Sequence, residues 1–152
     1  MRTPAFVLDN SVVIAWALGE GHADADVVMD LLVDGEARVP SVWPLEFANV
    51  LLVGERRKRL TEADAARVRE MVLSLPITVV PDDPARVLAT VFALARQQGL
   101  SVYDATYLDL AMRDGVPLAT LDGKLRDAAR RCSVPILVEE RAAPRPPRKA
   151  KR

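Results

Sequence analysis

The feature that most constrains the fold of this chain is the alternation of short β-type runs with longer helical patterns. The runs are rich in Val, Ile and Leu, and each is only a few residues long. They predict strands over residues 5–8, 37–42, 77–80, 117–121 and 135–138. Helical spacing of apolar residues separates them. This order predicts an α/β fold, a three-layer sandwich with a central, mostly parallel sheet of about five strands flanked by helices.

Local capping signals give the expected helix boundaries. Pro44 stands at the first turn of one helix, residues 61–64 read as a capping box, and Gly99 ends another helix. Together with the apolar spacing, these signals predict helices over residues 11–18, 23–33, 44–57, 62–74, 84–98, 101–115 and 123–131.

Composition excludes several classes of protein. The chain has 152 residues, which suits one domain, and its single cysteine allows no internal disulfide, so a cytoplasmic location is expected. The single histidine, His22, argues against mechanisms that need a histidine pair or a Ser-His-Asp set. No apolar run approaches the roughly 18 residues of a membrane span, so we expect a soluble protein without a membrane partner.

Charge is divided unevenly along the chain. Residues 141–152 carry six basic residues and no acids, whereas residues 1–140 carry 15 basic and 21 acidic residues, a net charge of −6. We expect residues 1–140 to form the domain and the basic, proline-rich tail 141–152 to be disordered. Whether the tail only aids solubility or binds RNA stays open.

Four acidic residues fall at one kind of place in the predicted fold. Asp9 and Asp122 follow predicted strands directly, and Glu46 and Asp104 lie in the first turns of predicted helices. In a parallel sheet, strand ends and the helix starts that follow them share one rim, where ligands bind. We therefore expect the four carboxylates to converge on one cavity.

Converging carboxylates have a physical consequence. They repel one another and are costly to desolvate, so such clusters usually surround a cation. Oxygen ligands without histidine or cysteine suit Mg²⁺ or Mn²⁺. These ions bind phosphate oxygens, activate water and stabilise a leaving oxygen.

Each acid also has a purely structural interpretation. Asp9 suits a turn or helix cap, and Glu46 suits the positive end of a helix dipole. Asp104 can complete a capping box with Ser101, and Asp122 can cap a helix or form an Asp-Gly turn. The metal-site interpretation depends on all four falling at the same rim.

Four segments resemble the motifs of the PIN-domain nucleases, in the same order and with similar spacing. Residues 7–11 read Val-Leu-Asp-Asn-Ser, residues 44–51 read Pro-Leu-Glu-Phe-Ala-Asn-Val-Leu, residues 101–108 read Ser-Val-Tyr-Asp-Ala-Thr-Tyr-Leu, and residues 118–122 read Leu-Ala-Thr-Leu-Asp. The resemblance covers about residues 6–138. At this length the chain is most similar to the VapC-type toxins of bacterial toxin–antitoxin pairs.

The resemblance implies an endoribonuclease that cleaves RNA with Mg²⁺ or Mn²⁺. It implies that the metal is held by four catalytic acids, Asp9, Glu46, Asp104 and Asp122. Ser11 and Thr120 would orient acids or water, and Asn49 would support Glu46 or touch substrate; ordinary capping and strand chemistry are the alternatives for the two hydroxyls. The resemblance also implies a homodimer and an antitoxin that inserts a segment at the acidic site.

Two other functions remain open from the sequence. Asp9 after the first strand could be the nucleophile of a phosphoryl-transfer enzyme or the acceptor of a receiver-like protein. The second acid expected two residues later is replaced by Ser11, and Lys124 lies in a helix start rather than at a late strand end. A non-catalytic RNA-binding module with a PIN-like fold is the other alternative.

The basic run 56–59 either complements a helix dipole or contacts phosphate.

Overall fold

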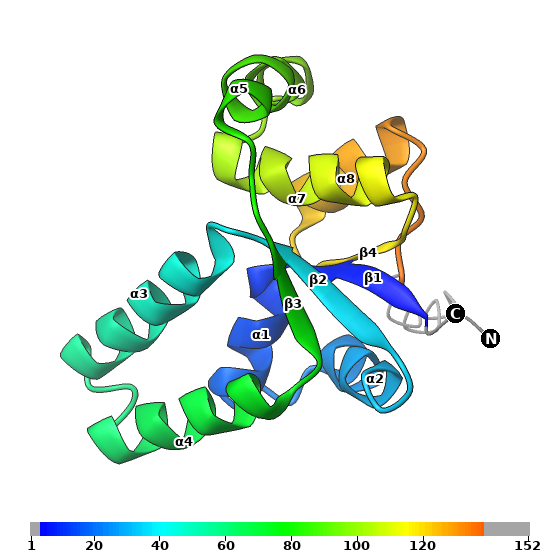
Figure 1. Ribbon diagram of the computed structural model, residues 1–152. Coiled ribbons are helices and arrows are strands. Elements are labelled where there is room, and N and C mark those ends of the chain that lie inside the picture. The colour runs from blue at the N-terminus through cyan, green and yellow to red at the C-terminus, as the bar shows by residue number, and fades with distance from the viewer. Residues whose placement is uncertain (1–3, 139–152) are drawn as a thin grey trace, which may run out of the picture.

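A parallel four-stranded sheet forms the centre of the molecule (Figure 1). The computed structural model describes residues 4–138, and within them the sheet has the order β3-β2-β1-β4. The strands are β1 (Ala5–Leu8), β2 (Glu36–Pro40), β3 (Ile77–Val80) and β4 (Leu118–Ala119). In the register, Val7 of β1 lies beside Arg38 of β2 on one side and Leu118 of β4 on the other. The first strand is therefore central in the sheet.

The predicted fifth strand is not formed as a strand. Residues 135–138 form a single parallel bridge, between Leu118 and Ile136, instead of a strand. Two hydrogen bonds hold the bridge: Leu118 N donates to Pro135 O, and Leu137 N donates to Leu118 O. A longer ladder has no partner, because β4 itself is only two residues long. The sheet has four strands and a bridge where about five strands were expected.

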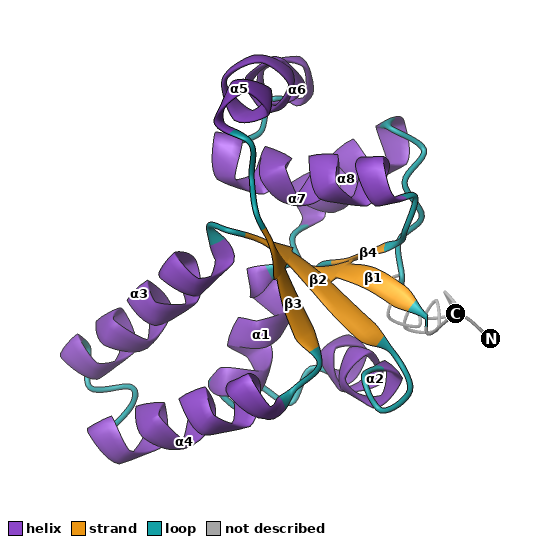
Figure 2. Cartoon of the chain, in the orientation of Figure 1, coloured by secondary structure: helices purple, strands orange, loops and turns teal. Residues whose placement is uncertain are grey.

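Helices cover both faces of the sheet, which confirms the three-layer sandwich (Figure 2). One layer contains α1 (Asn10–Ala17), α2 (Ala23–Leu31), α3 (Trp43–Arg56) and α4 (Glu62–Ser74). The other contains α5 (Pro84–Arg86), the π-helical segment η1 (Val87–Val91), α6 (Phe92–Gln98), α7 (Val102–Asp114) and α8 (Gly123–Arg131). The helix predicted over 84–98 is thus interrupted by one π-helical stretch.

The capping signals work as the sequence predicts. The side chain of Thr61 accepts from the backbone N–H of Asp64, whose carboxylate accepts from the N–H of Thr61, which completes the capping box of α4. Gly99 ends α6 with φ of +66°, a left-handed conformation that glycine adopts without a Cβ penalty.

The hydrophobic core holds the sheet and α7 in a fixed relation. Val7 and Leu8 of β1 are fully buried, as are Leu108 and Leu110 of α7. Burial on both faces is typical of a central parallel strand. The residue that follows β1, Asp9, is therefore fixed in place by the core.

None of the helices within residues 4–138 has the length and apolarity that crossing a bilayer requires. The predicted tail, residues 141–152, lies outside the described residues, so the division at residue 140 stays a prediction.

Candidate active site

The sheet order creates a topological switch point beside β1. The chain runs from β1 to β2 and β3 on one side and returns to β4 on the other. In open α/β sheets, ligands bind beyond the carboxyl ends of the strands at such a point. Asp9 lies directly after β1 at this position, and its backbone N–H donates to Ala119 O of β4 at 2.9 Å.

The Asp9 carboxylate is held by two hydroxyl groups. Ser11 Oγ donates to its Oδ2 at 2.6 Å, and Thr120 Oγ1 donates to the same oxygen at 2.8 Å. Both bonds converge on Oδ2, so Oδ1 has no side-chain donor among residues 4–138. One carboxylate oxygen is thus immobilised while the other keeps its capacity to bind a ligand.

The same hydroxyls also shape the loop after β4. Leu121 N donates to Ser11 Oγ at 2.9 Å, and Asp122 N donates to Thr120 Oγ1 at 3.0 Å. These bonds satisfy the backbone at the point where the predicted strand 117–121 leaves the sheet. They explain why β4 ends at Ala119, and they tie the loop that carries Asp122 to Asp9.

Burial dominates the electrostatics of Asp9. Its side chain is 5% exposed. Desolvation raises the pKa of Asp9 to about 6, the hydrogen bonds from Ser11 and Thr120 act in the opposite direction, and the charge of Asp104 adds to the rise. Near neutral pH this buried acid is mostly ionised, and within residues 4–138 no cationic side chain pairs with it, which is a costly arrangement for a site without a cation.

Glu46 is held by a tyrosine from another helix. Tyr107, fully buried on α7, donates its hydroxyl to Glu46 Oε1 at 2.7 Å. Desolvation raises the pKa of Glu46, the Tyr107 bond lowers it, and the charge of Asp104 raises it. The first turn of α3 is thereby linked to the first two turns of α7, next to Asp104.

The carboxylate of Asp104 takes no part in capping α7 among the described residues. Ser101 Oγ accepts from the Asp104 N–H at 3.1 Å, which caps α7, but the reciprocal bond that completes the box at Thr61 and Asp64 is absent here among the described residues. Burial, followed by the charge of Asp122, raises the pKa of Asp104, and Ser101 and Lys124 lower it.

Asp122 does serve as a helix cap. Its Oδ1 accepts from Leu125 N at 2.9 Å and begins α8, as the structural interpretation of the sequence allowed. The residue is exposed, and its charge acts on Asp104. Capping uses one oxygen, so this role does not exclude ligand binding by the other.

Asp104 connects the four acids. Its charge raises the pKa of Asp9 and of Glu46, and the charge of Asp122 raises the pKa of Asp104. The four carboxylates thus share one electrostatic neighbourhood. They do not form a closed cage: in the described part of the chain, no three Asp, Glu, His or Cys side chains stand in a group that could hold a metal ion as they are.

The donor chemistry nevertheless fits a hard divalent cation. All four side chains supply oxygen, and the Asp9 carboxylate is buried and has no cationic partner in the described part of the chain. Mg²⁺ keeps several water ligands and is commonly bound through one or two carboxylates. A fixed Asp9 with Asp104 as its acidic neighbour suits that mode of binding better than it suits an ion that needs a full set of protein ligands.

The structure also places the supporting residues. Ser11 and Thr120 both contact Asp9, whereas Asn49 is exposed on α3 and has no hydrogen bond to Glu46 within residues 4–138. Instead, Asn49 lines a cavity between α1 and α3.

Sequence reasoning missed two residues of this site. Tyr107 is not among the site residues that the sequence predicts, although its position three residues after Asp104 places it one helical turn away. Lys124 was considered only for a receiver-like role, yet its charge acts on Asp104. Lys124 lies two residues after Asp122 in the sequence, and this proximity to a predicted site residue could have indicated that it belongs to the site.

The fold and the rim together define an α/β protein with an acidic site at the switch point of a parallel sheet. The PIN domain family model matches residues 6–131. The chain therefore belongs to the PIN domain family.

Two proteins of Pyrobaculum aerophilum are similar to this chain. Ribonuclease VapC3 is 38% identical over 82 residues, which cover 54% of this chain and 63% of that relative, less than two thirds of its length. The crystal structure of PAE2754 has a TM-score of 0.65 and 26% identity, and the match covers 84% of this chain and 86% of that one.

More distant solved structures share the fold alone. VapBC2 from Rickettsia felis, bound to a DNA fragment from its promoter, has a TM-score of 0.62 at 13% identity, with coverage of 87% and 96%. VapC20 from Mycobacterium tuberculosis, a toxin that cleaves the sarcin-ricin loop, has a TM-score of 0.56 at 18% identity, with coverage of 81% and 94%.

Proposed function

We propose that this chain is a divalent-metal-dependent endoribonuclease and the toxin of a type II toxin–antitoxin pair. The observation that carries the proposal is the buried Asp9 carboxylate at the switch point, fixed by two hydroxyls and linked electrostatically through Asp104 to Glu46 and Asp122. Membership of the PIN domain family and the similarity to Ribonuclease VapC3 support the reaction class.

The proposal gives each acid a role. Mg²⁺ or Mn²⁺ would be held by Asp9, Glu46, Asp104 and Asp122, and when bound it would supply an activated water and charge stabilisation at the scissile phosphate. Ser11 and Thr120 hold Asp9 Oδ2, which directs ligand binding to Oδ1. Tyr107 holds one oxygen of Glu46 in the same way. Lys124 supplies a positive charge beside Asp104, where an RNA phosphate would arrive.

The proposal assigns the nuclease to residues 1–140. All four acids lie within the segment that matches the family. Residues 141–152 carry six basic residues and are assigned no part in the chemistry.

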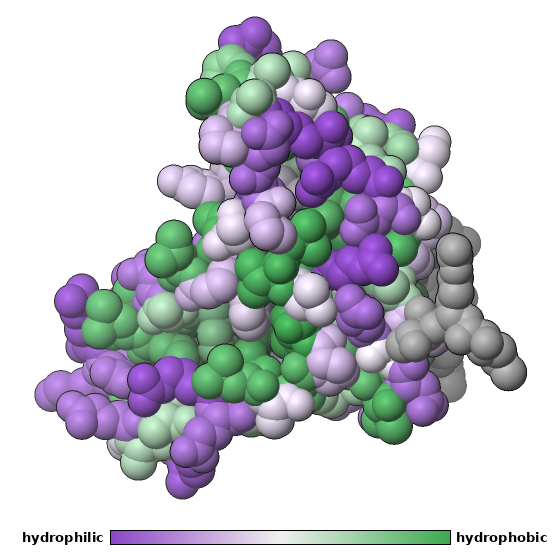
Figure 3. Space-filling view, in the orientation of Figure 1, coloured by the Kyte–Doolittle hydropathy of each residue, from purple (hydrophilic) through white to green (hydrophobic). Residues whose placement is uncertain are grey.

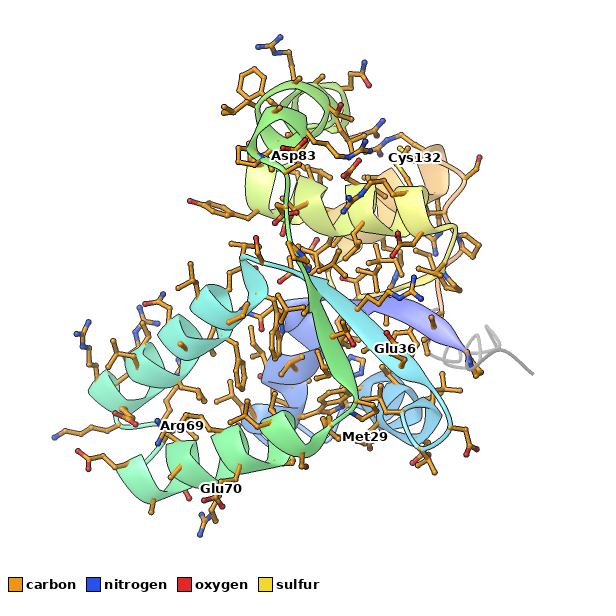
Figure 4. All side chains as sticks on the ribbon, in the orientation of Figure 1. Met29, Glu36, Arg69, Glu70, Asp83 and Cys132 are labelled. Carbon is orange, nitrogen blue, oxygen red and sulfur yellow. The ribbon has the colours of Figure 1, made fainter. Side chains whose placement is uncertain are left out.

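The proposed partners are an antitoxin and a second copy of the chain. Two apolar surfaces offer room for them. One is a groove between α3 and α4, visible as hydrophobic surface in Figure 3 and lined by Trp43, Pro44, Phe47, Ala48, Leu51, Arg69, Val72 and Leu73. Figure 4 shows Arg69 between these two helices. The other surface includes Leu88 and Phe92, which are 77% and 47% exposed.

RNA cleavage by acid variants tests the enzymatic proposal. We expect the purified protein to cleave RNA with Mg²⁺ or Mn²⁺ and not with a chelator, and we expect Asp104→Asn and Asp122→Asn each to abolish cleavage. Asp127→Asn is the matched control, because it removes an acid from the exposed face of α8 and leaves the rim intact. Cleavage by both rim variants at the wild-type rate would overturn the metal site. Phosphoryl labelling of Asp9 without RNA cleavage would favour the receiver-like alternative.

Partner binding needs separate measurements. Light scattering of the purified chain is expected to give the mass of a dimer. Co-expression with a short reading frame adjacent to this gene is expected to relieve growth arrest and to yield a stable complex. A monomer, or growth arrest that no neighbouring frame relieves, would contradict the corresponding partner.

A further inference from the structure

A cavity of about 300 Å³ lies between α1 and α3, away from the four acids. Its floor is apolar and comes from both helices, through Ile14, Leu18, Val50 and Val53. Two arginines beyond the end of α3, Arg57 and Arg59, form its rim. A cavity with an apolar floor and a cationic rim matches the two parts of a nucleotide, a base with its sugar and a phosphate.

Residues that line the cavity share one face of α3 with Glu46. Glu46, Asn49, Val53 and Arg57 follow one another at spacings of three to four residues, so they lie on the same side of the helix. The distance from Glu46 to Arg57 along the axis is about 16 Å, from a rise of about 1.5 Å per residue. In Figure 1, α3 extends from the centre of the molecule, where its first turn lies, toward the far end.

The two arginines are available to a ligand. Both are exposed, and within residues 4–138 neither forms an ion pair with an acidic side chain. Guanidinium groups bind phosphate through paired N–H donors. They belong to the basic run 56–59. Residues 1–140 carry a net charge of −6, so this run is a local positive patch that attracts RNA phosphate.

We propose that this cavity is a remote subsite for single-stranded RNA, in which Arg57 and Arg59 bind backbone phosphate and the floor of Ile14, Leu18 and Val53 receives a base or ribose. This inference rests on the proposed ribonuclease function and names how its substrate is held. A stacked strand rises about 3.4 Å per nucleotide, so the distance along α3 corresponds to roughly five nucleotides from the scissile phosphate. Asn49, between the acids and the arginines, then contacts the strand on its way.

The test compares two pairs of substitutions with equal loss of charge. Arg57→Gln with Arg59→Gln removes the rim of the cavity, and Arg56→Gln with Lys58→Gln removes two neighbouring cations that do not line it. Arg57→Lys with Arg59→Lys keeps the charge and shows whether the cations themselves suffice. The probes are fluorescein-labelled single-stranded RNAs of 12 and 3 nucleotides, measured by anisotropy with Mg²⁺ in an Asp104→Asn background that prevents cleavage. Circular dichroism and thermal unfolding confirm that each variant is folded.

The proposal predicts a difference that depends on RNA length. For the 12-nucleotide RNA, loss of Arg57 and Arg59 weakens binding on the order of tenfold or more, and the slope of log affinity against log salt falls in magnitude by about 1.4, since each phosphate contact on a single strand contributes about 0.7. The 3-nucleotide RNA is too short to contact the acids and the cavity at the same time, so its affinity falls by a smaller factor than that of the 12-nucleotide RNA. The lysine pair keeps the charge but lacks the paired N–H donors, so its affinity lies between those of the wild type and the glutamine pair.

Three results would overturn the subsite. Unchanged binding of the 12-nucleotide RNA would reject it and leave the cavity to a protein partner. An equal loss in the Arg56 and Lys58 pair would show a general charge effect, and an equal loss for the 3-nucleotide RNA would show that the longer strand does not bridge the acids and the cavity. The proposed enzymatic function is judged separately, by whether the wild-type protein cleaves RNA.

Discussion

Replacing Asp9 by asparagine separates the function of this carboxylate from its cost to the fold. Asparagine has nearly the same shape and keeps one oxygen that can accept from Ser11 and Thr120. It removes the buried negative charge. We expect Asp9→Asn to abolish RNA cleavage and, in the presence of a chelator, to make the folded state more stable at pH 7.5.

The magnitude follows from the pKa. Burial raises the pKa of Asp9 from 3.8 to about 6, and each pKa unit corresponds to about 1.4 kcal/mol. Ionising Asp9 in the folded state therefore costs about 3 kcal/mol relative to the unfolded chain. Hydrogen bonds to a neutral amide are weaker than those to a carboxylate, which reduces the gain. We expect a net stabilisation of about 1–3 kcal/mol, or roughly 2–12 °C in melting temperature for a domain of this size.

The pH dependence carries the sign of this effect. Between about pH 4 and pH 6 the folded wild type binds more protons at Asp9 than the unfolded chain does, so its free energy of unfolding falls as the pH rises through this window. The asparagine variant lacks this titration. The two proteins should therefore be closest in stability near pH 4 and furthest apart above pH 6.

Thermal unfolding from pH 4 to pH 8 measures this directly, with EDTA and then with Mg²⁺ or Mn²⁺. Metal at a hundredfold excess over its dissociation constant should stabilise the wild type by roughly 2.7 kcal/mol, increasingly so above pH 6, and should have little effect on the variant. Parallel stability profiles with EDTA, or a variant that is less stable at pH 7.5, would refute the electrostatic argument. Equal stabilisation of both proteins by metal would place the ion elsewhere.

Three further predictions concern other parts of the chain. Tyr107→Phe removes the hydrogen bond to Glu46 and should cost about 1 kcal/mol of stability in urea unfolding and slow RNA cleavage; a fully active variant would show that the bond does not position Glu46. Arg86→Ala removes two hydrogen bonds to the buried Asp109, 3.0 and 2.7 Å in length, and leaves Arg113 as the partner of that acid. It should lower the free energy of unfolding by about 2 kcal/mol. A decrease of less than about 0.5 kcal/mol would show that the pair does not stabilise the fold. Removal of residues 141–152 should leave cleavage of a short RNA intact and weaken binding of long RNA in a salt-dependent way; loss of the folded state on removal would show that the tail is structural.

The sequence by itself determines the local elements and the rim. Apolar spacing and capping residues place the helices to within a few residues, because hydrogen bonding and side-chain contacts within a helix are local. The four acids could be assigned to one rim without knowledge of the strand order, since the carboxyl ends of all parallel strands meet at the same edge. Their motifs then resemble one family closely enough to predict the fold.

Only the tertiary structure decides which residues meet at that rim. The order β3-β2-β1-β4 places Asp9 at the switch point, and a sheet order depends on long-range packing that periodicity does not encode. The same packing brings Tyr107 to Glu46, 61 residues away in the chain, and turns Asn49 toward a cavity rather than toward Glu46. It also reduces the predicted strand 135–138 to a bridge, because the neighbouring strand ends where its backbone is bonded to the side chains that hold Asp9.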